Sequence, residues 1–314
     1  MMRRTVRSEV HCFRYEAMAT FFELFIAGGS EAYARKASRA AFSEVDRLES
    51  LFSRFDPSSE ISRLARLLPG EAMRVGVETA EILELADLIR KETGGAFDIG
   101  WQSAEYARPR PLRAGARAGT RPVSGPTLFA PVKVSSRPGY FLAARARTVA
   151  KGPARGLPLK LDLGGIGKGR ALDGVKAVLG DWDIDNAMAH AGTSSVLAWG
   201  TGPDPERAGW PVRLSCRDAD PPCIRTLRLR DRALSGSGPE VKGPHILDPR
   251  TGRRASGKLI AWASAPAAAV SDALSTAFFV MGQAAIGRFC HEHPEVWAVV
   301  ITRRKKCKMF NVAP

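Results

Sequence analysis

A glycine-rich segment that also holds an acid and a lysine is the first candidate for chemistry. It runs from Asp162 to Gly169, reads D-L-G-G-I-G-K-G, and is followed by an apolar-patterned run, Arg170–Leu179, that predicts a helix. Glycines let the backbone approach a ligand and present its N–H groups, and the N-terminus of a helix favours anions. The glycine spacing fits neither a P-loop nor a dinucleotide fingerprint. By itself, the segment indicates a phosphate cradle or a plain turn with equal weight.

Two more sets of polar residues lie closer to the C-terminus. Asp272 and Thr276 are four residues apart in an expected helix, so both side chains project from one face and could hold a hard cation through oxygen. For this pair alone, the favoured alternative is a solvated aspartate beside a threonine that bonds back to its own helix. His245 ends an extended run before the turn sequence D-P-R-T-G, where an imidazole serves as a base, a ligand or a structural side chain.

The charge of the chain is its most pronounced bulk property. The 314 residues carry a formal net charge of +15, concentrated in Arg108–Arg170 and in the run from Arg303 to Lys308. Such basicity supports nucleic acid, an anionic membrane or a phosphorylated small molecule as a partner. No aromatic residues interleave with the basic clusters at base-stacking spacing. We therefore expect a solvated basic surface rather than a nucleic-acid interface.

The sequence also predicts the cellular location of the protein. No apolar run reaches the length of a membrane span, and no hydrophobic segment follows the basic N-terminal residues. The residues before Cys12 do not resemble a lipobox. The five cysteines show no C-x-x-C spacing, which favours free thiols in a reducing compartment. We expect a cytoplasmic protein without a membrane partner.

The pattern of elements predicts an α+β fold with sheets and packed helices. Expected helices cover Glu31–Leu51 with Ser30 as the cap, Glu60–Leu68, Val77–Glu92, Ala267–Met281 and Gln283–His291. Expected strands cover Phe13–Ala27, Ala187–Trp199, Trp210–Cys216, Ile224–Leu234, Leu259–Ala265 and Val296–Thr302. The stretch 108–156 is rich in Pro, Gly, Arg and Ala, and we expect loops and short strands there, as a mobile basic insertion.

Taken together and in order, these motifs resemble the ApbE-like family, which are Mg²⁺-dependent FAD:protein FMN transferases. The resemblance runs from about Met18 to Gly282. It is carried by M-A-T at 18–20, the block F-S-R-F-D-P-S-S-E-I-S-R-L at 52–64, F-D at 97–98, D-L-G-G-I-G-K-G at 162–169, S-G at 237–238, H-I-L-D-P-R-T-G at 245–252 and S-D-A-L-S-T-A-F-F-V-M-G at 271–282. It implies a single ApbE-like domain over 1–314, with two lobes, mainly antiparallel sheets and T-fold-like architecture.

The resemblance also implies a role for each matching residue. The metal ligands would be the Gly165 carbonyl, Asp272 and Thr276. Lys168 would meet the FAD pyrophosphate, and His245 would contact FAD and act as general base, with Asp272 counted among the catalytic residues. The flavin nucleotide would be contacted by Met18, Phe55, Ala96, Phe97, Asp98 and Asp162.

Several positions depart from the family pattern. The acid of the family's G-G-[DE] is missing from A-G-T-S-S at 191–195, T-S-G becomes G-S-G at 236–238, and Phe55 replaces a tyrosine. Ile99-Gly100 stands where the family has Pro-Thr, and the segment before His245 is short. FMN transfer to a Thr or Ser hydroxyl of an acceptor protein is therefore the leading hypothesis. The alternatives are a Mg²⁺-dependent FAD pyrophosphatase, a non-catalytic FAD-binding protein and a nucleic-acid-binding protein.

Overall fold

The computed structural model describes residues 8–100, 132–145, 159–204, 206–216, 223–239 and 246–312. The chain divides into two compact units, which are described separately. The first unit consists of the chain up to Glu49, Gly164–Ile246 and the chain from Ala255 onward. The second consists of Ser50–Leu163 and Leu247–Arg254.

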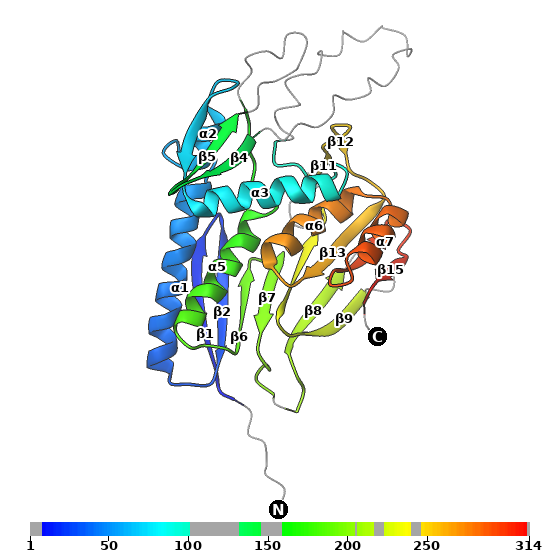
Figure 1. Cartoon of the computed structure of the whole chain (residues 1–314). Coiled ribbons are helices and arrows are strands. Elements are labelled where there is room, and N and C mark those ends of the chain that lie inside the picture. The colour runs from blue at the N-terminus through cyan, green and yellow to red at the C-terminus, as the bar shows by residue number, and fades with distance from the viewer. Residues whose placement is uncertain are drawn as a thin grey trace, which may run out of the picture. The chain divides into compact units, whose positions relative to one another are not determined.

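An eight-stranded antiparallel sheet forms the centre of the first unit (Figure 1). Its strands, in spatial order, are β1 (Val10–Ala17), β2 (Thr20–Ala27), β6 (Ala187–Ala191), β7 (Ser195–Trp199), β10 (Arg232–Ser237), β13 (Lys258–Ala265), β14 (Trp297–Thr302) and β15 (Cys307–Phe310). β14 is buried along nearly its whole length, which explains why its sequence is continuously apolar rather than alternating.

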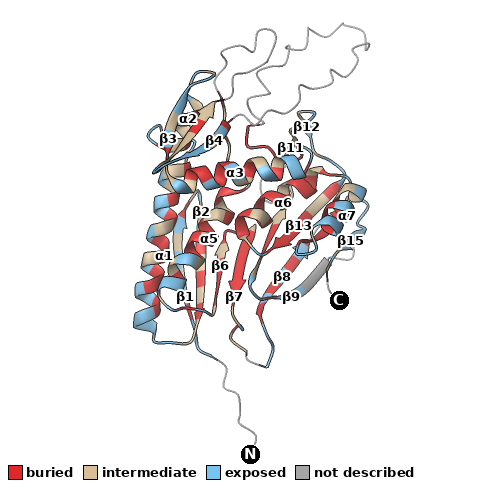
Figure 2. Cartoon of the chain, in the orientation of Figure 1, coloured by how far each residue is buried: buried red, intermediate tan, exposed pale blue. Residues whose placement is uncertain are grey.

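Helices and a β-hairpin pack against this sheet. The helices of the unit are α1 (Glu31–Phe52), α5 (Gly167–Asp181), α6 (Ala268–Val280) and α7 (Gln283–Glu292). Helix α5 contacts β6 and β7, and α6 contacts β10 and β13. A hairpin of β8 (Trp210–Cys216) and β9 (Cys223–Leu229) closes a separate apolar core that includes Trp210, Trp262 and Trp297. Figure 2 shows that α6, β7 and β13 are mostly buried.

The second unit is smaller and has its own sheet. Strands β3 (Ala72–Val75), β4 (Val132–Arg137) and β5 (Tyr140–Arg145) are ordered β3-β5-β4 and are accompanied by α2 (Glu60–Ala65) and α3 (Val77–Glu92). The Ser59 hydroxyl caps α2 by accepting the N–H of Ser62 at 3.0 Å. A two-stranded hairpin, β11 (Leu247–Asp248) with β12 (Arg253–Arg254), completes the unit.

Several predicted elements are present as expected. The helix Val77–Glu92 has the predicted bounds, and α1 begins after Ser30, whose hydroxyl accepts the N–H of Tyr33. Among the described residues, no helix combines the length and apolar character that a bilayer crossing requires. Cys12 and Cys290 are free thiols. Of the expected insertion, 132–145 forms the β4–β5 hairpin, and most of the remainder lies outside the described residues.

Three long predicted strands are each two strands instead, and the first two of these pairs form hairpins. Phe13–Ala27 is β1 and β2, Ala187–Trp199 is β6 and β7, and Ile224–Leu234 falls on β9 and β10. The first reversal occurs at Met18 and Ala19, which have φ angles of 52° and 55°. Neither residue type is typical of a turn with positive φ, so local composition gave no signal there. Strand β15 was missed because its surroundings are basic, although it pairs with β14 along four residues.

Candidate functional site

Turns and strand ends gather at one end of the large sheet. The β6–β7 turn reaches the start of β2, where the N–H of Gly192 donates to the Phe21 carbonyl at 2.7 Å. A Cβ at Gly192 would lie 2.5 Å from the Thr20 hydroxyl oxygen, so this approach requires glycine. Ser195, the first residue of β7, pairs with Ser235 of β10. The M-A-T turn, the start of β7 and the end of β10 therefore meet at the same end.

Helices α5 and α6 cross at unusually short range beside this end of the sheet. A Cβ on Gly169 would lie 2.2 Å from the carbonyl oxygen of Ala268, so only glycine allows the crossing. The helices also cap one another: Asp173 of α5 accepts the N–H groups of Ala268 and Ala269 at 2.7 and 2.9 Å. Burial raises the pKa of Asp173, and these two N–H donors oppose the shift. The reciprocal cap comes from Asp272 of α6 and fixes the register of the two helices.

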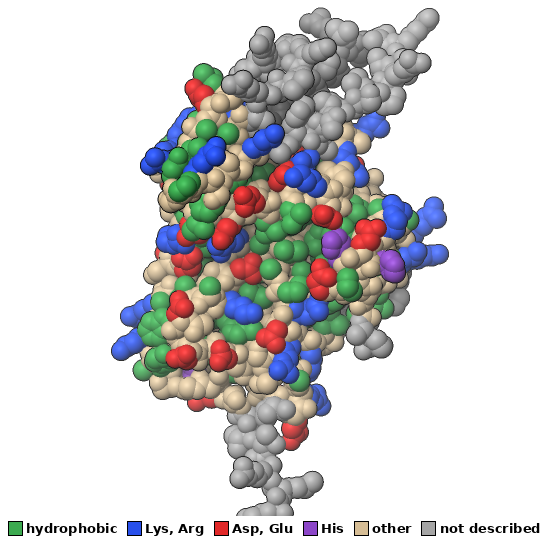
Figure 3. Space-filling view, in the orientation of Figure 1, with side chains coloured by type: hydrophobic (Ala, Val, Ile, Leu, Met, Phe, Trp, Pro, Cys, Tyr) green, Lys and Arg blue, Asp and Glu red, His purple; other side chains and the backbone are tan. Residues whose placement is uncertain are grey.

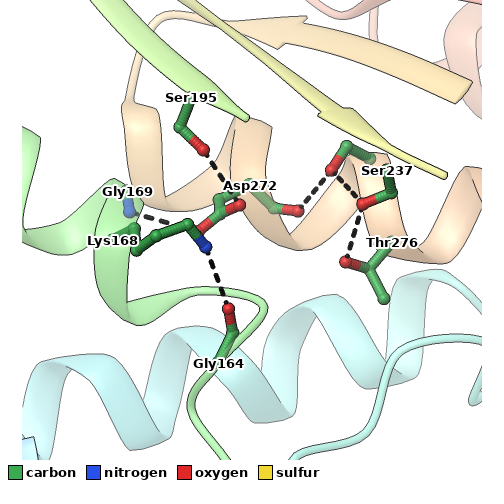
Figure 4. A network of polar contacts seen from close by, with 8 residues as sticks. Gly164, Lys168, Gly169, Ser195, Ser237, Asp272 and Thr276 are labelled. Atoms are coloured by element: carbon green, nitrogen blue, oxygen red, sulfur yellow. Dashed lines mark hydrogen bonds and ion pairs between the residues drawn. The ribbon is translucent and has the colours of Figure 1, made fainter. Parts of the chain in front are cut away.

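The Asp272 carboxylate is the centre of the polar cluster in Figure 4. It accepts the Gly169 N–H at 3.2 Å and the Ser195 hydroxyl at 3.1 Å, and its Oδ2 lies 3.5 Å from Lys168 Nζ. Lys168 also donates to the Gly164 carbonyl at 3.1 Å. The Asp272 residue is only 3% exposed. The alternative of a solvated aspartate is thus wrong, because this carboxylate is buried among donors from two other elements.

Hydroxyl groups surround the second predicted ligand on α6. Thr276 Oγ1 lies 3.2 Å from Ser237 Oγ, and Ser237 Oγ lies 2.8 Å from Ser275 Oγ. Ser275 in turn donates to the backbone carbonyl of Asp272 at 2.8 Å. The Thr276 hydroxyl therefore points to the end of β10 and lies within hydrogen-bond distance of Ser237. Gly165 lies in the turn before α5, and its role as a carbonyl ligand stays a prediction.

The donor set of this cluster is suited to a hard cation that shares its ligands with a phosphate. It offers one carboxylate, hydroxyls and loop carbonyls, and no group of three His, Cys, Asp or Glu residues occurs in the described part of the chain. Mg²⁺ is commonly held by one or two carboxylates together with substrate phosphates. The ammonium of Lys168 between Asp272 and Gly164 shows that this position stabilises positive charge. The described residues of this cluster therefore fit Mg²⁺, which prefers oxygen ligands.

Met18 lies on the β1–β2 turn rather than in the Asp272 cluster. Its backbone N–H donates to Glu49 Oε2 at 2.8 Å, and both residues line an open hollow of about 500 Å³. The predicted contact of Met18 with a flavin stays a prediction.

The second unit gathers another group of predicted site residues around Arg54. The Arg54 guanidinium lies over the ring of Phe55, 4.7 Å from its centroid, and 3.5 Å from the Asp162 carboxylate. The Phe55 side chain is otherwise open, with 81% of the residue exposed, so its ring face is available for stacking. Asp162 is tied to the F-D segment because its N–H donates to the Ile99 carbonyl at 2.8 Å.

The A-F-D segment itself is buried in the second unit. Ala96, Phe97 and Asp98 are 1%, 4% and 6% exposed. Asp98 accepts the Gly100 N–H at 2.7 Å, and burial raises the pKa of this carboxyl to about 6. Because the Phe97 side chain is enclosed, any contact of this residue with a nucleotide would have to use its backbone.

The raised pKa of Asp98 predicts a measurable pH dependence of stability. The folded protein holds this proton up to about pH 6, whereas the unfolded chain releases it near the ordinary value of 3.8. The free energy of unfolding should therefore fall by roughly 2 kcal/mol as the pH rises from 4 to 6. Asp98→Asn keeps an acceptor for Gly100 and should remove this contribution.

Urea unfolding of the wild type and of Asp98→Asn at pH 4, 5, 6 and 7 measures the effect as a difference between the two proteins. Exposed Asp181 supplies the matched control, Asp181→Asn. A difference between the wild type and Asp98→Asn that is constant across this range would contradict the assignment.

Several residues of these groups were not among the site residues predicted from the sequence. Ser195 was noted only as a position lacking the family's acid, yet its hydroxyl contacts Asp272. Asp173 and Arg54 carried no local signal, because their partners are distant or belong to other elements. Ser237 belonged to a quoted motif but had no assigned role. His245 lies outside the described residues, and its role as a base stays a prediction.

The sequence D-P-R-T-G after His245 forms a turn, as expected, and this turn joins β11 to β12. The Asp248 carboxylate accepts the N–H of Arg250 at 3.0 Å and pairs with its guanidinium at 2.9 Å. Gly252 closes the turn with a φ of 61°.

Comparison with known proteins identifies the family. The sequence profile of the ApbE family matches residues 18–301, and the protein therefore belongs to the ApbE family. No curated protein matches the chain.

Solved structures share the fold over nearly the whole chain. The apo flavinyl transferase ApbE of Pseudomonas stutzeri is 16% identical, with a TM-score of 0.73, covering 98% of this chain and 97% of that chain. The flavin transferase ApbE of Vibrio cholerae is 18% identical, with a TM-score of 0.73 and coverages of 96% and 97%. The ApbE protein of Thermotoga maritima is 22% identical, with a TM-score of 0.74 and the same coverages. These likenesses confirm the α+β, ApbE-like fold expected from the sequence.

Proposed function

We propose that this protein transfers the FMN moiety of FAD to a Thr or Ser hydroxyl of an acceptor protein and releases AMP. Family membership supports the reaction class, and one observation carries the assignment to this chain. The buried Asp272 carboxylate lies at the N-terminal end of α5, in contact with Lys168 and Gly169 of the glycine-rich segment. This places a carboxylate, an ammonium and a helix N-terminus together, as a pyrophosphate with its counter-cation requires.

In the proposed reaction, the acceptor hydroxyl oxygen forms a bond to the FMN phosphorus, and the bond from that phosphorus to the AMP oxygen breaks. The hydroxyl proton passes to a base, for which we propose His245, and AMP leaves as a phosphate monoester. Lys168 and the first N–H groups of α5 offset the charge on the pyrophosphate oxygens. Glycines 164, 165 and 167 leave room for the backbone to approach that group.

Asp272, Thr276 and the Gly165 carbonyl are the residues that would hold Mg²⁺. The ion would supply Lewis-acid stabilisation of charge on the phosphate oxygens. Asp272 is kept in place by Ser195 and by the N–H of Gly169, and Thr276 lies within hydrogen-bond distance of Ser237. These partners hold Asp272 against the glycine-rich segment and Thr276 against the end of β10.

We assign flavin-nucleotide contacts to Phe55, Asp98 and Asp162 of the second unit, and to Met18. The open ring of Phe55 supports stacking, and Arg54 adds a cation beside Asp162. We also place the protein in the cytoplasm, a proposal supported by the free thiols of Cys12 and Cys290.

Lys168 and a divalent cation compete for the same carboxylate, which gives a prediction that does not depend on turnover. Lys168→Met should bind Mn²⁺ about tenfold more tightly in the absence of FAD, because an ammonium no longer neutralises Asp272. The same variant should bind FAD more weakly, because a cation for the pyrophosphate is lost. Paramagnetic titration of Mn²⁺ measures the first effect, and Lys176→Met on the same helix is the control. Weaker Mn²⁺ binding by Lys168→Met would contradict the placement of the cation at Asp272.

Three outcomes of one assay separate the proposed activity from its alternatives. The protein is incubated with FAD and Mg²⁺, with and without a candidate acceptor that exposes a threonine, and AMP and covalently bound flavin are measured. AMP that appears only with the acceptor, together with flavin that survives denaturation, supports transfer. AMP without acceptor identifies a pyrophosphatase. Tight FAD binding without AMP identifies a binding protein, and the absence of FAD binding refutes all three.

A further inference from the structure

The turn between β14 and β15 carries a cluster of exposed cations that the proposed reaction does not use. Arg303, Arg304, Lys306 and Lys308 surround a pocket of about 480 Å³, which also includes Gln283, the first residue of α7. Figure 3 shows Lys and Arg side chains gathered on the side of the molecule where α7 and β15 lie. The sequence predicted a solvated basic surface, and the four cations are indeed exposed; the structure adds that they line one hollow.

These four cations lack the partners that neutralise other cations of the same unit. On α1, Arg47 lies 2.7 Å from Glu44, and Arg35 also pairs with a glutamate. No acidic residue lines the pocket, and none of its four cations forms an ion pair within the described part of the chain. Like charges held together without a counter-charge create a positive potential that favours an anion.

Backbone hydrogen bonds hold the turn that presents these cations. Thr302 donates its N–H to the Lys306 carbonyl at 3.0 Å, and Arg303 donates to the Gly257 carbonyl at 3.0 Å. Gly257 adopts a φ of 94°, a conformation that favours glycine. The cations are thus presented by a fixed hairpin, so little backbone ordering would oppose ligand binding.

We propose that this pocket binds a compact oligophosphate, meaning two or more linked phosphate groups without a stacked base. Two arginines supply forked donors that match phosphate oxygens, and two lysines add charge. The volume suits a small ligand rather than a duplex, which requires an extended basic face. No aromatic residue lines the pocket, so the stacking platform used for single-stranded nucleic acid is absent from it. Helix α7, whose N-terminus has no side-chain cap, adds N–H groups beside Gln283.

Calorimetric titration with inorganic tripolyphosphate, in EDTA and low salt, tests this site. We expect saturable binding that weakens at least tenfold in Arg303→Gln/Arg304→Gln and in Lys306→Gln/Lys308→Gln. Lys36→Gln/Arg39→Gln, which removes two exposed cations of α1, is the matched control and should bind as the wild type does. Lys168→Met should retain this binding, because the pocket is separate from the Asp272 cluster.

Three results would overturn the proposal. The first is the absence of saturable tripolyphosphate binding by the wild type. The second is binding that is lost in Lys168→Met but retained in both pocket variants, which would assign the ligand to the FAD site. The third is tighter binding of a single-stranded oligonucleotide through the same four residues, which would make the hairpin a nucleic-acid surface.

Discussion

Asp272→Ala is expected to abolish Mg²⁺-dependent AMP release from FAD, with a loss of at least about a thousandfold. Asp272 is the only carboxylate of the polar cluster built on α5, α6 and β7 in the described structure. Its removal takes away the carboxylate that we propose as the charged metal ligand and leaves the Lys168 ammonium without its ion-pair partner. Mn²⁺ affinity should fall together with turnover, because both depend on the same oxygen atoms.

Because Asp272 is buried and caps α5, a conservative variant is needed to distinguish a loss of catalytic activity from a loss of folded protein. Asp272→Asn preserves the shape of the side chain and one acceptor oxygen, so it should fold with cooperative thermal unfolding and remain inactive. Asp181→Ala removes an exposed aspartate at the end of α5 and should keep full activity. A folded Asp272→Asn protein that releases AMP at the wild-type rate would refute the metal-ligand assignment.

Gly169→Ala is expected to lower the stability of the protein more than any other addition of a single methyl group at the site. The new Cβ would lie 2.2 Å from the Ala268 oxygen and 2.5 Å from the Ala268 carbonyl carbon, and neither is the end of a flexible side chain. The two helices would have to separate, which should cost about 1–3 kcal/mol of unfolding free energy. The same displacement lengthens the bond from the Gly169 N–H to Asp272, so activity should fall even in the folded fraction.

A second glycine of the same helix provides the control. A Cβ on Gly180 meets nothing within 4 Å, so Gly180→Ala should be neutral or stabilise the protein by up to about 1 kcal/mol through helix propensity. Urea denaturation of both variants gives the comparison. Equal stabilities for Gly169→Ala and Gly180→Ala would show that the helix crossing tolerates a side chain.

The sequence predicted those parts of the fold that have a local signal. Helix α3 was located with the correct bounds because its apolar residues recur at helical spacing and its C-terminus is followed by Gly94. Helix α5 begins at Gly167, three residues before the predicted start at Arg170. Glycine has low helix propensity, so local reasoning treated these residues as a turn. Contacts with α6 override that propensity.

The same distinction applies to the roles of the glycine-rich segment. From the sequence, the four glycines together indicated either a phosphate cradle or a plain turn. In the structure, Gly169 serves the packing of α5 against Ala268, and Lys168 contacts Asp272 as well as Gly164. Residues of this one motif therefore have two different roles: Gly169 packs against α6, and Lys168 contacts a buried carboxylate.

By itself, the sequence determined the family, the α+β class and the residue types available for chemistry, because periodicity, turn residues and motif order are local properties of the chain. Only the tertiary structure decided which groups meet. Ser195 and Gly169 reach Asp272 across 77 and 103 residues of sequence, and no spacing rule connects them. The physical reason is that these contacts follow from strand pairing and from a helix crossing that a single Cβ would prevent. The same folding turned a basic run into a pocket, because the backbone of the β14–β15 turn holds its four cations around one hollow.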